Sequence, residues 1–109
     1  MIYITLYRYV VGENECKCGF LTALDDYFDL YTSFVLSAEF TERLPQPEID
    51  MENTKSYFTQ KGNRSFNKAI RNCRKAYEAK GIKFVQEVYD TELDNIIYQD
   101  QYQIVVRTN

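Results

Sequence analysis

The chain has 109 residues, a formal net charge of −3 and an apolar fraction of 45%, which is enough for one hydrophobic core. The absence of histidine excludes Ser–His and Cys–His nucleophile pairs, histidine general bases and zinc sites that use imidazole. Four scattered glycines exclude a Walker loop and a GxGxxG dinucleotide motif, and we expect residues 1–109 to form a single domain.

Residues 2–11 are rich in β-branched and aromatic side chains and lack glycine and proline, which predicts a strand. Because side chains alternate along a strand, Tyr3, Tyr7 and Tyr9 share one face. That face has three interpretations: packing against cross-strand neighbours, stacking on nucleic-acid bases, or burial in a homodimer. A turn at 12–14 and a short return strand over 15–20 are expected to follow.

A helix is predicted over residues 23–40, with Thr22 as a candidate capping residue. Apolar side chains recur at helical spacing and predict a wide buried face: Leu24, Tyr27, Phe28, Leu30, Tyr31, Phe34, Val35 and Ala38. The opposite side carries Asp25, Asp26, Asp29 and Ser33.

The segment 43–54 contains both prolines and predicts an exposed connection. Residues 55–60 favour a strand over a single helical turn, and 61–63 have the composition of a turn. Ser65 is positioned to cap a second helix that runs to Lys80, with Gly81 as its stop. The predicted core face of that helix is Phe66, Ala69, Ile70, Cys73, Ala76 and Tyr77.

Strands are predicted over residues 82–89 and 101–107, whereas 91–99 fits either a short helix or a strand. The element order predicts an α+β fold, in which a mostly antiparallel sheet of three to five strands carries two main helices on one face.

Charge is strongly segregated along the chain. Residues 1–54 carry a net charge of −7, residues 55–83 carry +8, and residues 84–109 carry −4. On the second predicted helix, Arg64, Lys68, Arg71 and Lys75 form a stripe with Arg74 at its edge, and Glu78 is the acidic residue at pairing distance. This stripe is either a solvated helix face or a binding face for a polyanion or an acidic partner.

The acidic residues of the N-terminal half include Asp25, Asp26 and Asp29. These residues have three interpretations. They keep the protein soluble and interact favourably with the helix dipole, or they complement the basic stripe within one chain or across a dimer. Alternatively, they imitate phosphates and bind a nucleic-acid-binding cleft of another protein. Paired carboxylates also suit Mg²⁺, but no lysine at motif spacing and no glycine loop accompanies them, so catalysis is not favoured.

Three cysteines, Cys16, Cys18 and Cys73, cannot all pair within one chain. They offer three soft ligands, but structural zinc sites usually combine two spaced pairs, and the second pair is missing. We therefore predict no metal and no cofactor. The N-terminal residues lack the pattern of a signal peptide, and no stretch approaches the roughly 20 apolar residues of a membrane span, so we expect a cytoplasmic protein with reduced thiols.

No motif in the sequence identifies a family. The leading hypothesis is a small non-enzymatic inhibitor that contacts a nucleic-acid-handling protein complex through a charged surface. Residue types with A/T-rich codons are abundant, which suits a phage or mobile-element protein of the anti-CRISPR type. The alternatives are a module that binds nucleic acid directly through the basic helix over 64–80, and a small metal-dependent enzyme.

Overall fold

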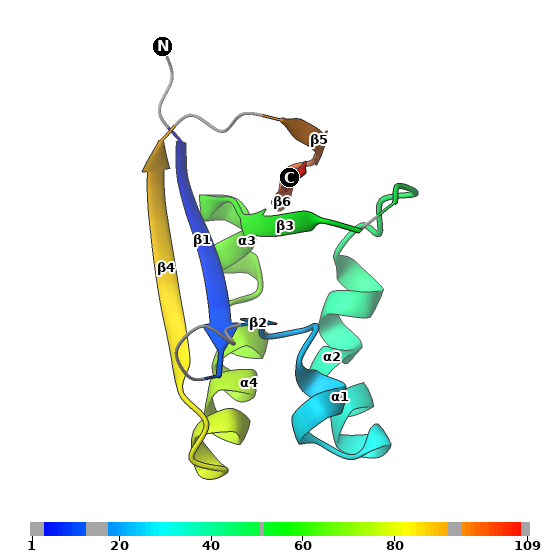
Figure 1. The fold of residues 1–109 in the computed structure, drawn as a ribbon, viewed down its shortest axis with the longest axis vertical. Helices are drawn as coiled ribbons and strands as arrows, with labels where there is room; N and C mark the ends of the chain where they lie inside the picture. The colour runs from blue at the N-terminus through cyan, green and yellow to red at the C-terminus, as the bar shows by residue number, and fades with distance from the viewer. Residues whose placement is uncertain (1–3, 13–17, 51, 92–94, 108–109) are drawn as a thin grey trace.

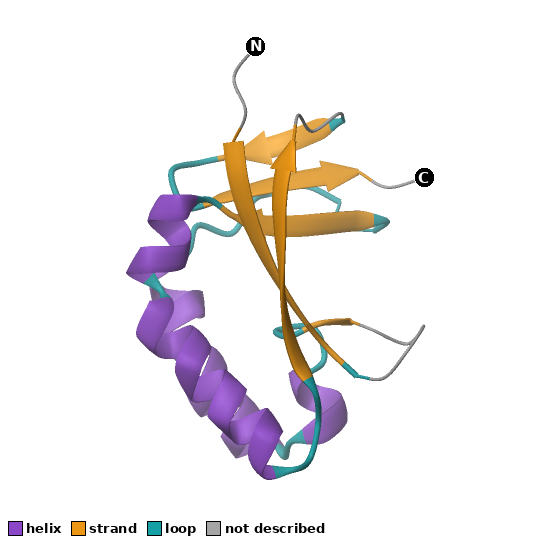
Figure 2. Cartoon of the chain, turned by 90° about the vertical axis from the view of Figure 1, so that its left-hand side faces the viewer, coloured by secondary structure: helices purple, strands orange, loops and turns teal. Residues whose placement is uncertain are grey.

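The structure is a computed structural model that describes residues 4–12, 18–50, 52–91 and 95–107 (Figure 1). The strands are β1 (Ile4–Val11), β2 (Cys18–Gly19), β3 (Thr54–Phe58), β4 (Phe84–Thr91), β5 (Ile96–Gln99) and β6 (Gln103–Arg107). The helices are α1 (Leu24–Tyr27), α2 (Leu30–Arg43), α3 (Gln60–Ser65) and α4 (Asn67–Ala79). The pairs formed by the described strands are antiparallel, and the helices lie on one face of the sheet, which confirms the predicted α+β fold (Figure 2).

Strand β1 organises the sheet. Along one edge it pairs with β4 over eight residues, from Ile4–Thr91 to Val11–Phe84. Along its other edge it meets two strands in succession: Tyr7 pairs with Phe58 of β3, and Val10 and Val11 pair with β2. Strand β3 continues the sheet through β6 to β5. Strands β1 and β4 therefore run steeply across the direction of β3, β5 and β6 (Figure 2).

The main core lies between the sheet and the helices and is built largely from aromatic rings. Phe40 stacks on Phe66 with ring centroids 5.3 Å apart, and Phe20 meets Phe40 edge to face at 5.5 Å. The buried Tyr77 hydroxyl donates to the Phe20 carbonyl at 2.6 Å. A second cluster, made of Leu6, Tyr57, Ile104 and Val106, is buried on the other face of the sheet.

The single helix predicted over 23–40 is wrong in detail, because the chain breaks it into α1 and α2. Phe28 has an extended backbone, with φ −128° and ψ 155°. The side chain of Asp29 then accepts the Thr32 N–H at 2.7 Å and caps α2. Thr22 does not cap the helix, since α1 begins after Ala23 without a side-chain cap, and α2 continues to Arg43.

The predicted buried face of this region is also wrong for α2. Leu30, Tyr31 and Phe34 are 84%, 77% and 70% exposed, whereas Ser33 is buried. Phe28 and Asp29, which precede α2, have extended backbones and interrupt the helical spacing, and Ser33 and Phe40 are the buried residues of α2.

The second predicted helix is two helices joined at Phe66. Thr59 caps α3 by accepting the Gly62 N–H at 3.1 Å, and Ser65 lies inside α3 rather than at a cap. The turn predicted at 61–63 is therefore helical. The predicted core face of α4 is confirmed by the burial of Phe66, Ala69, Ile70, Cys73 and Tyr77.

The remaining predictions concern strand boundaries and turns. Gly81 has φ +74° just after α4, as expected of a helix stop. Residues 54–58 and 96–99 are strands, which settles the two ambiguous segments in favour of β structure. The predicted return strand over 15–20 is described only for Cys18–Gly19, and residues 13–17 lie outside the described part of the chain.

Candidate functional site

The most unusual surface of the molecule is an exposed apolar face on α1 and α2. We call it the apolar face and define it by Tyr27, Leu30, Tyr31, Phe34 and Val35. The exposed fractions of these side chains run from 37% to 84%, which leaves on the order of several hundred Å² of largely apolar surface open to solvent. Large exposed apolar patches of this kind on soluble proteins are often functional, so this face is a candidate interaction surface.

Three exposed carboxylates lie at the N-terminal end of the apolar face. Asp25 and Asp26 are in α1, and Asp29 caps α2 directly before Leu30. The hydrogen bonds from Thr32 hold the pKa of the Asp29 carboxyl below its usual value, so this group is ionised at neutral pH. The three aspartates and the apolar face together form a continuous stretch of chain that we call the α1–α2 surface.

The residues of the predicted basic stripe lie on two helices, with Arg64 in α3 and Lys68, Arg71 and Lys75 in α4. Arg64, Lys68, Arg71 and Lys75 are all exposed, and none of them forms an ion pair within the described residues. Arg74 differs, because it lies 3.7 Å from Glu78 and its guanidinium stands over the Phe84 ring at 5.3 Å. We therefore restrict the name basic stripe to Arg64, Lys68, Arg71 and Lys75.

The two helices that carry these surfaces are antiparallel neighbours. Cys73 of α4 donates to the Leu36 carbonyl of α2 at 3.6 Å, and Arg43 at the end of α2 reaches the Ser65 carbonyl at 3.4 Å. At the other end, Phe28 packs edge to face on Tyr77 at 5.0 Å. The α1–α2 surface and the basic stripe are thus carried by adjacent helices on the same side of the sheet (Figure 2).

Two of the three tyrosines of the predicted face, Tyr7 and Tyr9, pack against the main core. Tyr9 is 6% exposed and packs against Phe20, Phe58 and Phe84. Its hydroxyl donates to Asn63 and accepts the Gln86 amide at 2.9 Å, and burial raises its pKa. Tyr7 is half-buried against the same core, and Tyr3 lies outside the described residues. Tyr9 is a packing residue in this structure.

The cysteines are not gathered at one place that the structure describes. Cys73 is buried in the main core, where desolvation raises the pKa of its thiol to about 12. Cys18 belongs to β2, and Cys16 lies outside the described residues. Across residues 4–12, 18–50, 52–91 and 95–107 no group of three or more Cys, Asp or Glu side chains is arranged to hold a metal ion. No described helix is long and apolar enough to cross a membrane.

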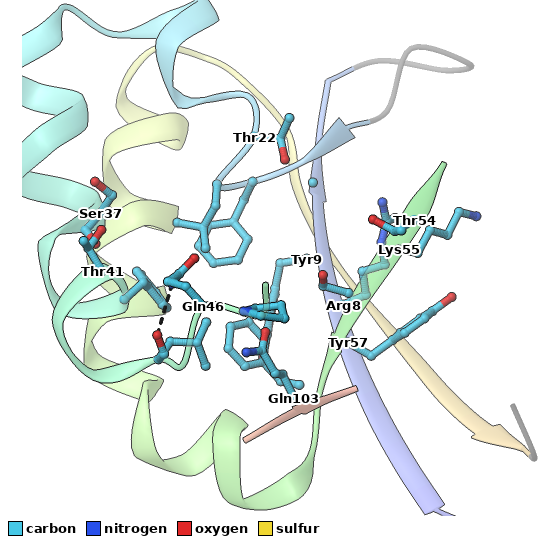
Figure 3. Close-up of a pocket in the computed structure, with 18 residues that line it drawn as sticks. Arg8, Tyr9, Thr22, Ser37, Thr41, Gln46, Thr54, Lys55, Tyr57 and Gln103 are labelled. Atoms are coloured by element: carbon cyan, nitrogen blue, oxygen red, sulfur yellow. Dashed lines mark hydrogen bonds between the residues drawn. The ribbon is translucent and has the colours of Figure 1, made fainter. Parts of the chain in front are cut away.

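A groove opens between α2 and the diverging strands β1 and β3 (Figure 3). Its volume is about 730 Å³, which falls in the range of ordinary ligand pockets. Sequence reasoning missed it, because it depends on where β1 turns away from β3. The apolar face, by contrast, has a signal in the sequence, because its apolar positions form part of a wider stripe than the seam that two packed helices need.

Comparison of the chain with protein-family models, with curated proteins and with solved structures finds no match. A cluster of exposed carboxylates beside exposed aromatic and aliphatic side chains is suited to docking against a protein that is both basic and apolar.

Proposed function

We propose that this protein is a non-enzymatic binding protein that docks its α1–α2 surface into the nucleic-acid-binding cleft of a partner protein. The observation that carries the proposal is the position of Asp25, Asp26 and Asp29 at one end of the exposed apolar face. Occupation of such a cleft blocks nucleic acid from it, which is the activity of an anti-defence inhibitor.

The chemistry of the α1–α2 surface supports a protein partner over free nucleic acid. Lysine and arginine side chains that bind phosphates also bind carboxylates, so aspartates can occupy phosphate positions. Leu30, Tyr31 and Phe34 then supply the desolvated centre that a stable protein interface needs, and a phosphate backbone offers no equivalent apolar contact.

The proposal is tested by immobilising this protein and capturing its partner from an extract of the cells in which the protein naturally occurs. Wild-type protein should retain a nucleic-acid-binding protein, and Asp25→Lys/Asp26→Lys/Asp29→Lys should lose it. Tyr31→Ser/Phe34→Ser should lose it as well, without loss of stability, because both side chains are largely exposed. Arg64→Glu/Lys68→Glu/Arg71→Glu is the matched control and should still capture the partner. Equal capture by all three variants would refute the proposal.

A second candidate function is direct binding of nucleic acid through the basic stripe. It is favoured by the four exposed cations, which have no ion-pair partner within the described chain. Binding of duplex DNA should then weaken with salt, with a slope of about −0.9 in log K per log salt for each phosphate neutralised. Arg64→Glu/Lys68→Glu/Arg71→Glu should abolish that binding, and no binding of DNA or RNA at low salt would exclude this candidate.

A further inference from the structure

One edge of β3 faces the groove, and beyond Phe58 none of the described strands lies beside it. Strand β6 pairs with all five residues of β3, from Thr54 to Phe58. On the opposite edge, Phe58 pairs with Tyr7 of β1, and no described strand continues the ladder toward Lys55. The edge of β3 from Lys55 to Tyr57 is therefore available for pairing with another chain.

This edge of β3 is open because the next residues of β1 pair with Phe20 and β2 instead. The Phe20 N–H donates to the Tyr9 carbonyl at 3.1 Å, and Val10 and Val11 pair with β2. These contacts occupy the backbone groups of β1 that would otherwise pair with the rest of β3. The two strands separate after Tyr7 and Phe58, and the groove lies in the angle between them (Figure 3).

The backbone of Ser56 points into this angle. The Thr59 N–H donates to the Tyr102 carbonyl, on the side of β3 where β6 lies. Because backbone groups alternate between the two edges of a strand, the N–H and C=O of Ser56 face the opposite edge, as those of Phe58 do.

The two sides of the groove differ in chemistry. On the helix side it is floored by Phe20, Phe40, Leu44 and Phe58, all of which are buried. On the other side lie Arg8 of β1 and Lys55 of β3 (Figure 3). None of the described residues that line the groove is Asp or Glu, although the chain as a whole is acidic. Glu87, which contacts Arg8 at 3.4 Å, lies outside the lining.

One end of the groove is held in a fixed shape by two amides. Gln46 donates to the Leu44 carbonyl at 3.0 Å (Figure 3), and Gln103 donates to the Pro45 carbonyl at 2.6 Å. The Gln103 bond ties the segment after α2 to β6, and the Gln46 bond lies within that segment. The groove is therefore already formed before anything binds, which reduces the entropic cost of binding.

We propose that this groove binds an extended peptide that adds a strand to β3 and whose side chains alternate between apolar and acidic residues. Strand addition supplies main-chain hydrogen bonds, and alternate side chains then fall on opposite faces of the sheet. Apolar side chains of the peptide enter the aromatic floor, and acidic side chains face Arg8 and Lys55. The site uses no residue of the α1–α2 surface and stands independently of the proposed function.

The test uses a fluorescent peptide of about seven residues in which leucine and glutamate alternate, a little longer than the strand it would pair with. Its fluorescence anisotropy should rise on titration with the protein. A leucine–lysine peptide of the same pattern should bind about tenfold or more weakly, because it places like charges opposite Arg8 and Lys55. A peptide with the same leucines and glutamates in separate blocks should also bind weakly, since its side chains cannot alternate.

Variants of the protein locate the site. Lys55→Glu should weaken binding about five- to tenfold, and Lys83→Glu, an exposed lysine outside the groove, should not. Ser56→Pro removes the backbone donor on the open edge and should abolish binding, whereas Ser56→Ala keeps that donor and should bind like wild type.

Backbone amide shifts provide a second measurement that does not depend on Ser56→Pro being folded. On saturation with the leucine–glutamate peptide, the largest shifts should fall on Lys55–Tyr57 and on Gly19–Phe20, which line the groove. Shifts confined to the apolar face, equal affinity for the leucine–lysine peptide, or no binding at all would each overturn the proposal.

Discussion

Ser33 is a polar residue in a place where an apolar one would fit. It is 5% exposed, and its hydroxyl has no hydrogen-bond partner among the described residues. A buried hydroxyl without a partner destabilises the folded state, and alanine is also the better helix former. Ser33→Ala should raise the free energy of unfolding by about 1 kcal/mol. Urea unfolding followed by circular dichroism measures this, and a destabilised variant would show that Ser33 has a partner.

Gly62 is required by a close approach of two backbones. A Cβ atom at this position would overlap the backbone carbonyl of Tyr102, which accepts the Thr59 N–H. Gly62→Ala should therefore cost about 2–3 kcal/mol, because the contact between α3 and the start of β6 must move.

Gly81 is the comparison for Gly62. It has φ +74° but open space around it, so Gly81→Ala should cost only about 1 kcal/mol. Thermal unfolding of the two variants side by side measures the difference. Similar costs at the two positions would show that crowding by Tyr102 is unimportant.

Cys73 makes stability depend on alkaline pH. Burial raises the pKa of its thiol from 9.0 to about 12, so the folded chain holds this proton more tightly than the unfolded chain does. Its stabilising contribution is complete below pH 9 and is lost as the pH rises from 9 toward 12. In a Cys16→Ser/Cys18→Ser background, the urea midpoint should fall over that range, and Cys73→Ala should show a smaller fall. An equal fall in both proteins would assign the effect to other groups.

At the scale of elements, the break between α1 and α2 decides which side chains reach the solvent. Local patterns predicted the helical segment, because apolar residues recur at helical spacing throughout it. They did not predict the break, since Phe28 becomes extended where its ring packs on Tyr77 of α4, a contact distant in the sequence. Tyr31 and Phe34, which follow the break in the chain, are both exposed.

Asp29 has two roles at this break, and substitution can separate them. It caps α2 and contributes one of the three carboxylates of the α1–α2 surface. Asparagine also caps helices, so Asp29→Asn should keep most of the thermal stability that Asp29→Ala loses. Both variants should weaken partner binding, because both remove the charge. Normal binding by Asp29→Asn would show that this carboxylate does not contact the partner.

The cap also has a predicted pH dependence. Hydrogen bonding to Thr32 lowers the pKa of Asp29 below its usual value of 3.8, so its contribution is present above that pH. It should be lost as the pH falls through the lowered pKa. The difference in thermal midpoint between wild type and Asp29→Ala should therefore shrink in acid.

At the scale of the whole molecule, the sequence predicted the fold class, four of the strand positions and the core face of α4. These features rest on local periodicity and on turn residues such as Gly81. The groove and its open β3 edge were not predictable, because they arise where Phe20 and β2 displace β3 from β1. The charge segregation was visible in the sequence, and the structure carries the two signs on adjacent helices.

If the α1–α2 surface occupies a nucleic-acid-binding cleft, this protein and nucleic acid must compete for the partner. The affinity of this protein for the isolated partner should be measured at increasing concentrations of duplex DNA or RNA of the kind that the partner binds. We predict competition, in which the apparent Kd of the protein for the partner rises in proportion to the nucleic acid concentration. Asp25→Lys/Asp26→Lys/Asp29→Lys should not bind the partner with or without nucleic acid. An affinity that is unchanged at saturating nucleic acid would show that the α1–α2 surface does not occupy the nucleic-acid-binding cleft.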